Sequence, residues 1–262
     1  MPKFCANLTM LYNELDFMDR FEAARADGFA GVEYLFPYPY PKEELAQRLK
    51  RHGLVQVLHN LPAGDWGRGD RGIACQPERQ EEFRAGIAKA IDYATTLGCK
   101  QVNCLAGVAP QNADPDELRR TFVDNVRHAA GELKKAGIRL LIEPVNTRDI
   151  PGFYLNKSDQ AEAILKEIGS DNLAIQYDFY HTQVMEGDIV NRFKRLKDRI
   201  AHVQIADNPG RNEPGTGEIN YPFIFDTLDR EGYRGWVGCE YKPAAATTAG
   251  LAWYAPYRAR SS

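Results

Sequence analysis

Short apolar runs alternate with longer amphipathic segments along the chain. In the longer segments apolar residues recur at three- and four-residue spacing, which predicts helices with one buried face; Phe83, Ile87, Ala90 and Ala94 are an example. The short runs, such as residues 140–142, are interpreted as buried strands. Counted from Phe4, the pattern predicts eight strands with helices between them.

Glycines mark the passage from helix to strand in this repeat. A glycine just past a helix end can adopt the left-handed conformation without a Cβ clash. The six glycines in this position are Gly28, Gly53, Gly98, Gly137, Gly169 and Gly232. Their similar spacing predicts one repeated βα unit, and therefore an α/β fold with a single domain over residues 1–262.

A (β/α)8 barrel, the TIM barrel, is the predicted architecture. The length of 262 residues is typical of that fold. A doubly wound open sheet is the alternative, but no G-x-G-x-x-G follows the first predicted strand.

Oxygen-bearing side chains stand where four successive predicted strands end. They are Glu143, Asp178, Gln204 and Glu240. In a barrel the strand ends meet at one face, and an acid at the end of a buried strand needs a compensating partner. Such an all-oxygen set suits Mg²⁺ or Mn²⁺, and a cation would relieve the mutual repulsion of the acids. The competing interpretation is that each acid caps its own strand or pairs with a nearby Arg.

Two histidines are candidates for binding the substrate. His181 lies three residues after Asp178, and His59 ends the third predicted strand. An ordinary hydrogen-bonded loop histidine explains His181 equally well. His202 precedes Gln204 by two residues and is predicted to lie one layer deeper in the barrel, as a hydrogen-bonded core residue.

Long loops rich in Gly, Arg and aromatic residues follow the third, fifth and seventh predicted strands, at residues 61–72, 147–154 and 208–217. Long ordered loops usually carry function, so this end of the barrel is the predicted working face. Arg211 could bind a substrate carboxylate bidentately, with solvation as the alternative. Trp66, among four glycines, could be the aromatic tip of a lid, with a plain surface loop as the alternative.

Composition excludes some classes of function. A net charge of −3 gives no basic surface of the kind that binds nucleic acid. The sequence contains no run of about 18 apolar residues, so no membrane span is expected. The sequence begins without an apolar leader, and its five scattered cysteines form no C-x-x-C pair. Free thiols in a reducing cytoplasm are therefore expected. The choice between a monomer and a homo-oligomer stays open.

Several segments resemble the hydroxypyruvate isomerase family, which belongs to the xylose-isomerase-like barrels. The resemblance covers nearly the whole chain, and the segments that carry it are residues 58–66, 71–75, 145–153, 177–181 and 213–219. The wider group contains metal-dependent sugar isomerases, epimerases and endonucleases. The resemblance implies that Glu143 and Glu240 are the acid/base pair. It also implies that both glutamates, with Asp178 and Gln204, bind the metal.

The reaction that the resemblance implies is the interconversion of hydroxypyruvate and tartronate semialdehyde through an enediolate, with a small hydroxy-oxo acid as substrate. A 2-oxo-tetronate isomerase or an epimerase of a ketose or sugar acid is the alternative. Related ketose epimerases carry His where this chain has Gln204, which argues against a simple transfer of epimerase activity. A carbohydrate-binding barrel without catalysis is disfavoured by the four oxygen ligands. A DNA-repair nuclease is disfavoured by the five histidines, too few for a multi-zinc cluster, and by the acidic charge.

Overall fold

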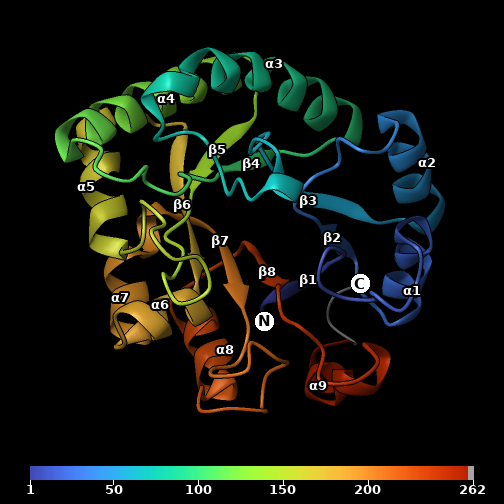
Figure 1. The fold of residues 1–262 in the computed structure, drawn as a ribbon. Helices are drawn as coiled ribbons and strands as arrows, with labels where there is room; N and C mark the ends of the chain where they lie inside the picture. Colours follow the sequence, from blue (N-terminus) through green and yellow to red (C-terminus); the bar gives the residue numbers. More distant parts are fainter. Residues whose placement is uncertain (259–262) are drawn as a thin grey trace.

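Eight parallel strands close into a barrel in the computed structural model, which describes residues 1–258. The strands pair in sequence order and β8 closes on β1, while the helices form the outer ring (Figure 1). The predicted TIM barrel is therefore confirmed. Residues 259–262 of the expected single domain lie outside the described residues. The strands are β1 (Lys3–Asn7), β2 (Gly31–Glu33), β3 (Val55–Asn60), β4 (Gln101–Cys104), β5 (Arg139–Ile142), β6 (Leu173–Asp178), β7 (Ile200–Ile205) and β8 (Trp236–Cys239).

The helices lie between successive strands and beyond β8. The α-helices are α1 (Arg20–Ala26), α2 (Lys42–His52), α3 (Gln80–Leu97), α4 (Pro115–Lys135), α5 (Ser158–Ile168), α6 (Phe179–Met185), α7 (Ile189–Leu196), α8 (Tyr221–Arg230) and α9 (Ala255–Arg258). Short 3-10 turns are η1 (Phe17–Asp19), η2 (Trp66–Arg68), η3 (Pro77–Arg79), η4 (Lys197–Arg199) and η5 (Thr248–Tyr254). None of the helices in residues 1–258 combines the length and apolar composition needed to cross a bilayer.

The predicted glycine positions end the helices as expected. Gly53, Gly98 and Gly169 are the C-caps of α2, α3 and α5, with φ angles of 61°, 67° and 66°. A side chain in this left-handed region would meet its own backbone, which is why the chain uses glycine to turn from helix to strand.

The core has two parts. The larger cluster lies between strands and helices, whereas the smaller one is drawn from strands and includes Cys5, Leu58, Leu141 and Ala174. Side chains from strands fill the interior of such a barrel, and the smaller cluster provides this packing here. All five cysteines are buried free thiols, which confirms the expectation of unpaired cysteines.

The strands bring the predicted site residues to the same end of the barrel. Asp178 pairs with Gln204 across β6 and β7, and Gln204 pairs with Gly238 across β7 and β8. Glu143 and Glu240 each follow the last residue of their strands. The barrel therefore collects the four oxygen-bearing side chains at the carboxyl ends of β5 to β8.

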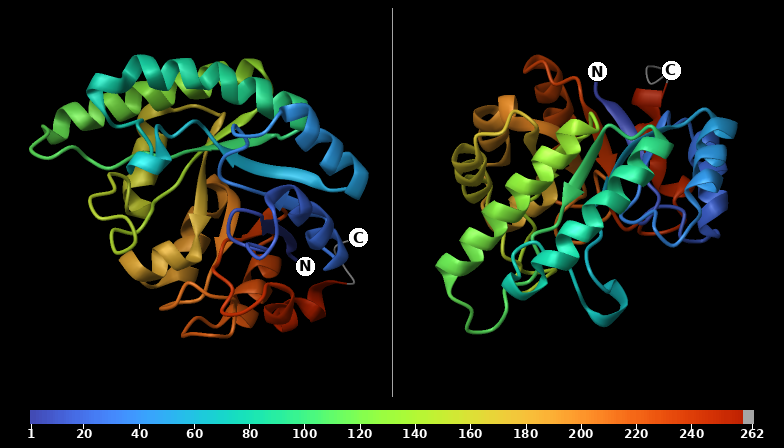
Figure 2. Two further views of the ribbon diagram at one scale, coloured as in Figure 1. Left: turned by 45° about the vertical axis from the view of Figure 1, so that its right-hand side comes forward. Right: turned by 90° about the horizontal axis from the view of Figure 1, so that it is seen from above.

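The C-terminal elements pack against the start of the barrel. The ring of Phe4 in β1 meets Phe225, Trp253 and Tyr254 with centroid separations of 5.0, 5.4 and 5.6 Å. In Figure 2 the red η5 and α9 lie beside the blue start of the chain. This aromatic cluster joins the two ends of the described chain.

Phe4→Ala should therefore lower the free energy of unfolding by about 3–5 kcal/mol, as for other buried Phe truncations. Phe223→Ala is the control, because this ring is 48% exposed and its loss should change stability by no more than about 0.5 kcal/mol. Urea unfolding followed by circular dichroism measures both. Equal effects of the two substitutions would show that the Phe4 cluster does not hold the barrel together.

Candidate active site

A cavity of about 170 Å³ opens at the carboxyl ends of the strands. It is smaller than the roughly 300–1,000 Å³ of pockets for drug-sized ligands, so its size suits a small metabolite. Six of the eight predicted site residues line it: Trp66, Glu143, His181, Gln204, Arg211 and Glu240.

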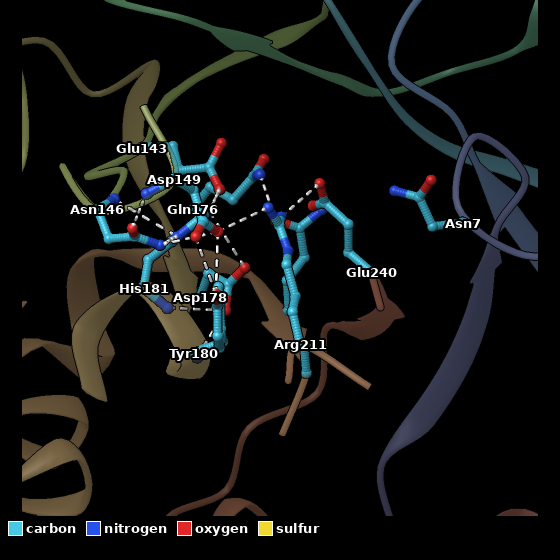
Figure 3. Close-up of polar contacts among 12 residues, drawn as sticks. Asn7, Glu143, Asn146, Asp149, Gln176, Asp178, Tyr180, His181, Arg211 and Glu240 are labelled. Atoms are coloured by element: carbon cyan, nitrogen blue, oxygen red, sulfur yellow. Dashed lines mark hydrogen bonds and ion pairs between the residues drawn. The ribbon is translucent and has the colours of Figure 1, made fainter. Parts of the chain in front are cut away.

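Glu143, Asp178 and His181 form a buried group on one side of the cavity (Figure 3). One ligand atom from each lies within 4.8 Å of the other two. Asp178 ends β6 and caps α6, since its Oδ1 accepts the backbone N–H of Tyr180 at 2.7 Å and that of His181 at 3.4 Å. Asp178 Oδ2 has no hydrogen-bond partner within residues 1–258. This carboxylate oxygen is thus free for a cation or substrate.

Hydrogen bonds from Asn146 fix the protonation of the His181 ring. Nδ1 of His181 accepts the Asn146 backbone N–H at 3.4 Å and faces the Asn146 side-chain Nδ2 at 2.6 Å. A ring nitrogen that accepts carries no proton, so the neutral imidazole holds its proton on Nε2. Nε2 lies 3.7 Å from Asp178 Oδ2 and 4.0 Å from Glu143 Oε1. His181 therefore presents an N–H donor to the cavity.

Arg211 stands between this group and Glu240 (Figure 3). Its guanidinium lies 3.2 Å from Glu240 Oε1 and 3.2 Å from Asp149 Oδ2, and 5.2 Å from the centre of the Tyr180 ring. The Arg211 backbone has a φ of 56°, which is uncommon for a residue with a side chain, and its carbonyl accepts the Lys242 N–H at 2.7 Å. The surrounding contacts hold Arg211 in this conformation at the mouth of the barrel.

Burial and mutual repulsion shift the pKa values of the carboxyl groups. The pKa of Glu143 lies well above its usual value because of burial and the charges of Glu240 and Asp178. Burial raises the pKa of Glu240 to about 8, although Arg211 opposes the rise, and burial raises the pKa of Asp178 to about 6. Burial, followed by the charges of Arg211 and Arg148, holds the pKa of His181 well below its usual value. Several groups here favour their uncharged forms unless a cation joins them.

The residues present fit a divalent cation. Glu143, Asp178, Gln204 and Glu240 would supply hard oxygen ligands, and Asp178 Oδ2 has no hydrogen-bond partner among the described residues. A second buried group, Cys5, Glu33 and His202, lies deeper in the barrel. There the His202 Nε2 and Glu33 Oε2 already bond at 2.7 Å, as expected for a core histidine.

His59 does not line the cavity, which corrects its assignment to the substrate site. Successive residues of a strand face opposite sides, and Leu58 and Asn60 are the ones at the cavity. The His59 ring packs instead on Tyr38, with a centroid separation of 5.9 Å, and burial lowers its pKa to about 4. Trp66 does line the cavity, where its ring lies 5.0 Å from Phe36 and 4.3 Å from the guanidinium carbon of Arg71.

Sequence reasoning missed several residues at the cavity. Glu33, Asn7, Gln176 and Lys242 all line it. Glu33 ends a short apolar strand, the same pattern that identified Glu143, so the sequence alone could have predicted Glu33 as a site residue. The pKa of Glu33 is lowered: burial raises it, but the His202 charge and the hydrogen bonds of its neighbours outweigh that effect. Asn7 likewise ends the apolar strand β1, whereas Gln176 and Lys242 carry no comparable pattern.

Comparison with known proteins shows that the chain belongs to the xylose isomerase-like TIM barrel family, which matches residues 21–257. A hydroxypyruvate isomerase of Escherichia coli is 54% identical over 258 residues, covering 98% of this chain and 100% of that protein. A 2-oxo-tetronate isomerase of Cupriavidus necator is 48% identical, covering 99% of this chain and 100% of that protein. A Brucella melitensis crystal structure described as an AP endonuclease, family 2, is 44% identical with a TM-score of 0.96, covering 98% of this chain and 100% of that one.

Metal binding should raise the thermal stability more at high pH than at low pH. The raised pKa values, about 6 for Asp178 and about 8 for Glu240, mean that the metal-free folded state binds protons that a cation must displace. These groups therefore destabilise the metal-free protein as pH rises towards 8, and the ion removes that penalty.

Tm measured with excess Mn²⁺ and with a chelator gives the increment at each pH. At 100 times Kd an ion contributes about 2.7 kcal/mol, and the increment at pH 8 should clearly exceed that at pH 5.5. An increment that is absent, or that falls as pH rises, would contradict a carboxylate site for the metal.

Proposed function

We propose that the protein is a divalent-metal-dependent isomerase that interconverts hydroxypyruvate and tartronate semialdehyde (2-hydroxy-3-oxopropanoate). The observation that carries this proposal is the pair of buried glutamates, Glu143 and Glu240, at one small cavity with Arg211 between them. The 54% identity to a hydroxypyruvate isomerase over nearly the whole chain supports the same substrate class.

The reaction requires two proton transfers between adjacent carbons. One glutamate removes a proton from C3 of hydroxypyruvate, and the resulting enediolate takes a proton at C2 from the other glutamate. The C3 oxygen gives up its hydroxyl proton as it becomes the aldehyde, and the C2 oxygen gains one as it becomes the hydroxyl. Carboxyl groups with raised pKa values suit this work, because a raised pKa makes the carboxylate a stronger base.

Other side chains at the site would orient Glu143, bind the substrate oxygens and hold the metal ion. Asn103 Nδ2 donates to Glu143 Oε2 at 2.8 Å, which leaves Oε1 of this glutamate for the substrate or the ion. The Nε2–H of His181 would donate to a substrate oxygen. A divalent ion held by Glu143, Asp178, Gln204 and Glu240 would act as a Lewis acid that stabilises negative charge on the two reacting oxygens.

Lys242 is the residue that we assign to the substrate carboxylate together with Arg211. The Arg211 guanidinium is already shared between Asp149 and Glu240. Lys242 also lines the cavity, and within residues 1–258 its ammonium group has no ion-pair partner. One backbone hydrogen bond joins the two cationic residues, from Lys242 N–H to Arg211 O at 2.7 Å. The side-chain Nδ2 of Asn212, the next residue after Arg211, donates to Lys242 O at 2.7 Å.

A 2-oxo-tetronate isomerase is the second candidate, because three relatives of that description are 48%, 44% and 43% identical over nearly the whole chain. Both reactions move a carbonyl between adjacent carbons, and the acids differ by one carbon. Values of kcat/KM for both acids, with Mg²⁺ or Mn²⁺ present, decide between them. A clearly higher kcat/KM for the four-carbon acid would favour the 2-oxo-tetronate isomerase over the hydroxypyruvate isomerase. No turnover of either would overturn the substrate class.

Glu143→Gln and Glu240→Gln should each lower kcat by at least about 10²–10⁴-fold, since the amide keeps its shape but takes up no proton. The double variant should be little worse than the weaker single one, because the two residues act as a unit. Glu132→Gln is the control, because this partly exposed carboxylate does not line the cavity and pairs with Lys135 in the last turn of α4.

Exchange of the C3 hydrogen of hydroxypyruvate in deuterated solvent separates the two roles. The variant that lacks the first base should stop this exchange, whereas the other variant can retain it while net isomerisation fails. Near-normal turnover by either single variant with metal bound would refute the paired-glutamate mechanism.

Lys242→Met should raise KM for hydroxypyruvate with little change in kcat, whereas Arg211→Ala should also lower kcat because Glu240 loses its partner. The expected loss of binding is about 1.5–3 kcal/mol, the range for hydrogen bonds to charged groups. Steady-state kinetics with a neutral ketose as second substrate checks the assignment. If Lys242→Met weakens acid and neutral substrates equally, Lys242 does not bind the carboxylate.

A further inference from the structure

Glu33 is a buried carboxylate in the wall of the cavity that has no part in the proton transfers above. It is the last residue of β2 and is 1% exposed. Its Oε1 accepts from Asn7 Nδ2 at 3.0 Å and from Gln204 Nε2 at 2.8 Å. Its Oε2 meets His202 Nε2 at 2.7 Å and Cys5 Sγ at 3.4 Å. Four polar groups from β1 and β7 therefore converge on this one carboxylate.

The barrel leaves room for this carboxylate by means of a glycine. Gly238 of β8 stands beside Gln204 and Cys5 in the strand register. A Cβ atom at Gly238 would lie 2.4 Å from Glu33 Oε1 and 2.5 Å from Glu33 Oε2. Such contacts are too close for any side chain, so a larger residue at this position would force Glu33 away from Gln204.

The contact with Glu33 decides which way the Gln204 amide faces. Glu33 Oε1 accepts two N–H groups and offers no proton, so the Gln204 amide nitrogen must point to it. The Gln204 carbonyl oxygen is then at the opposite end, where Gln176 Nε2 donates to it at 2.6 Å. If the amide turned over, its nitrogen would replace the oxygen at that end, and an amide nitrogen is no ligand for a hard cation.

We propose that Glu33 is a positioning residue that fixes the Gln204 amide with its carbonyl oxygen available to the divalent ion. The inference rests on the proposed function, because it takes Gln204 as one of the ligands. Ligand orientation by an outer hydrogen-bond partner is a general feature of metal sites. Here the device consists of Glu33, the donors that surround it and the space left by Gly238.

Mn²⁺ affinity of the purified, metal-depleted full-length protein, measured by electron paramagnetic resonance, tests this role without relying on activity. Glu33→Gln keeps the shape of the side chain but removes the preference for one orientation of Gln204. It should weaken Mn²⁺ binding by about 10- to 100-fold, the usual effect of losing such a partner. Gly238→Ala keeps every charge and donor but displaces Glu33, and it should weaken binding in the same direction.

Matched controls separate this effect from a general loss of stability. Asp27→Asn neutralises another buried carboxylate, which accepts from the hydroxyl of Tyr12 at 3.0 Å and does not line the cavity. Gly131→Ala adds a Cβ in α4 where no atom lies within 4 Å. Both controls should bind Mn²⁺ like the wild type, whatever their Tm.

Wild-type affinity in folded Glu33→Gln or Gly238→Ala would overturn the inference. Failure of the wild type itself to bind Mn²⁺ would instead overturn the proposed metal site. If neither variant folds, nuclear magnetic resonance of the unaltered protein decides. Nitrogen-15 relaxation of the Gln204 side-chain amide should then report a rigid group, as expected for an amide held by Glu33 and Gln176, and a mobile amide would contradict the fixed orientation.

Discussion

The repulsion among buried carboxylates at the carboxyl ends of β5 to β8 is the constraint on which the site depends. Glu143, Asp178 and Glu240 are all buried, and burial alone disfavours their charged forms. A closed parallel barrel fixes their spacing, because each strand is hydrogen-bonded to its two neighbours and the acids cannot move apart. Arg211 offsets part of this charge, and a divalent ion would offset most of the remainder. The same repulsion that weakens the metal-free fold would thus favour the binding of a cation.

The scaffold around these acids is asymmetric in its chemistry. Towards solvent, Arg211 and Lys242 supply positive charge at the rim, where an acidic substrate would enter. Towards the interior, the His202–Glu33 pair and the amides of Asn7 and Gln204 form a hydrogen-bonded network that reaches the wall of the cavity. Truncation of one member of a buried charged pair is usually strongly destabilising, since it leaves an unpaired charge. This network should therefore stabilise the fold, and in our proposal its Glu33 also orients the Gln204 amide.

Much of this arrangement was predictable from the sequence, because strand periodicity and helix-ending glycines carry direct structural information. The acids that end apolar runs identified one face of the barrel, and Glu143 and Asp178 do lie close together there. The assignment of His59 to the substrate site was wrong because the sequence does not show which residues of β3 point into the cavity. Leu58 and Asn60 line the cavity, and His59 lies between them on the opposite face of the strand. The role of Gly238 depends on a contact with Glu33, 205 residues earlier in the chain, and no local pattern reports such a distant contact.

The most direct test of the central claim is the anomalous diffraction of a crystal soaked in Mn²⁺. The account predicts one strong peak in the cavity, coordinated by oxygens of Glu143, Asp178, Gln204 and Glu240 at roughly the 2.0–2.1 Å typical of small hard cations such as Mg²⁺. A peak at Cys5, Glu33 and His202 instead, or no peak at the cavity at saturating Mn²⁺, would contradict it.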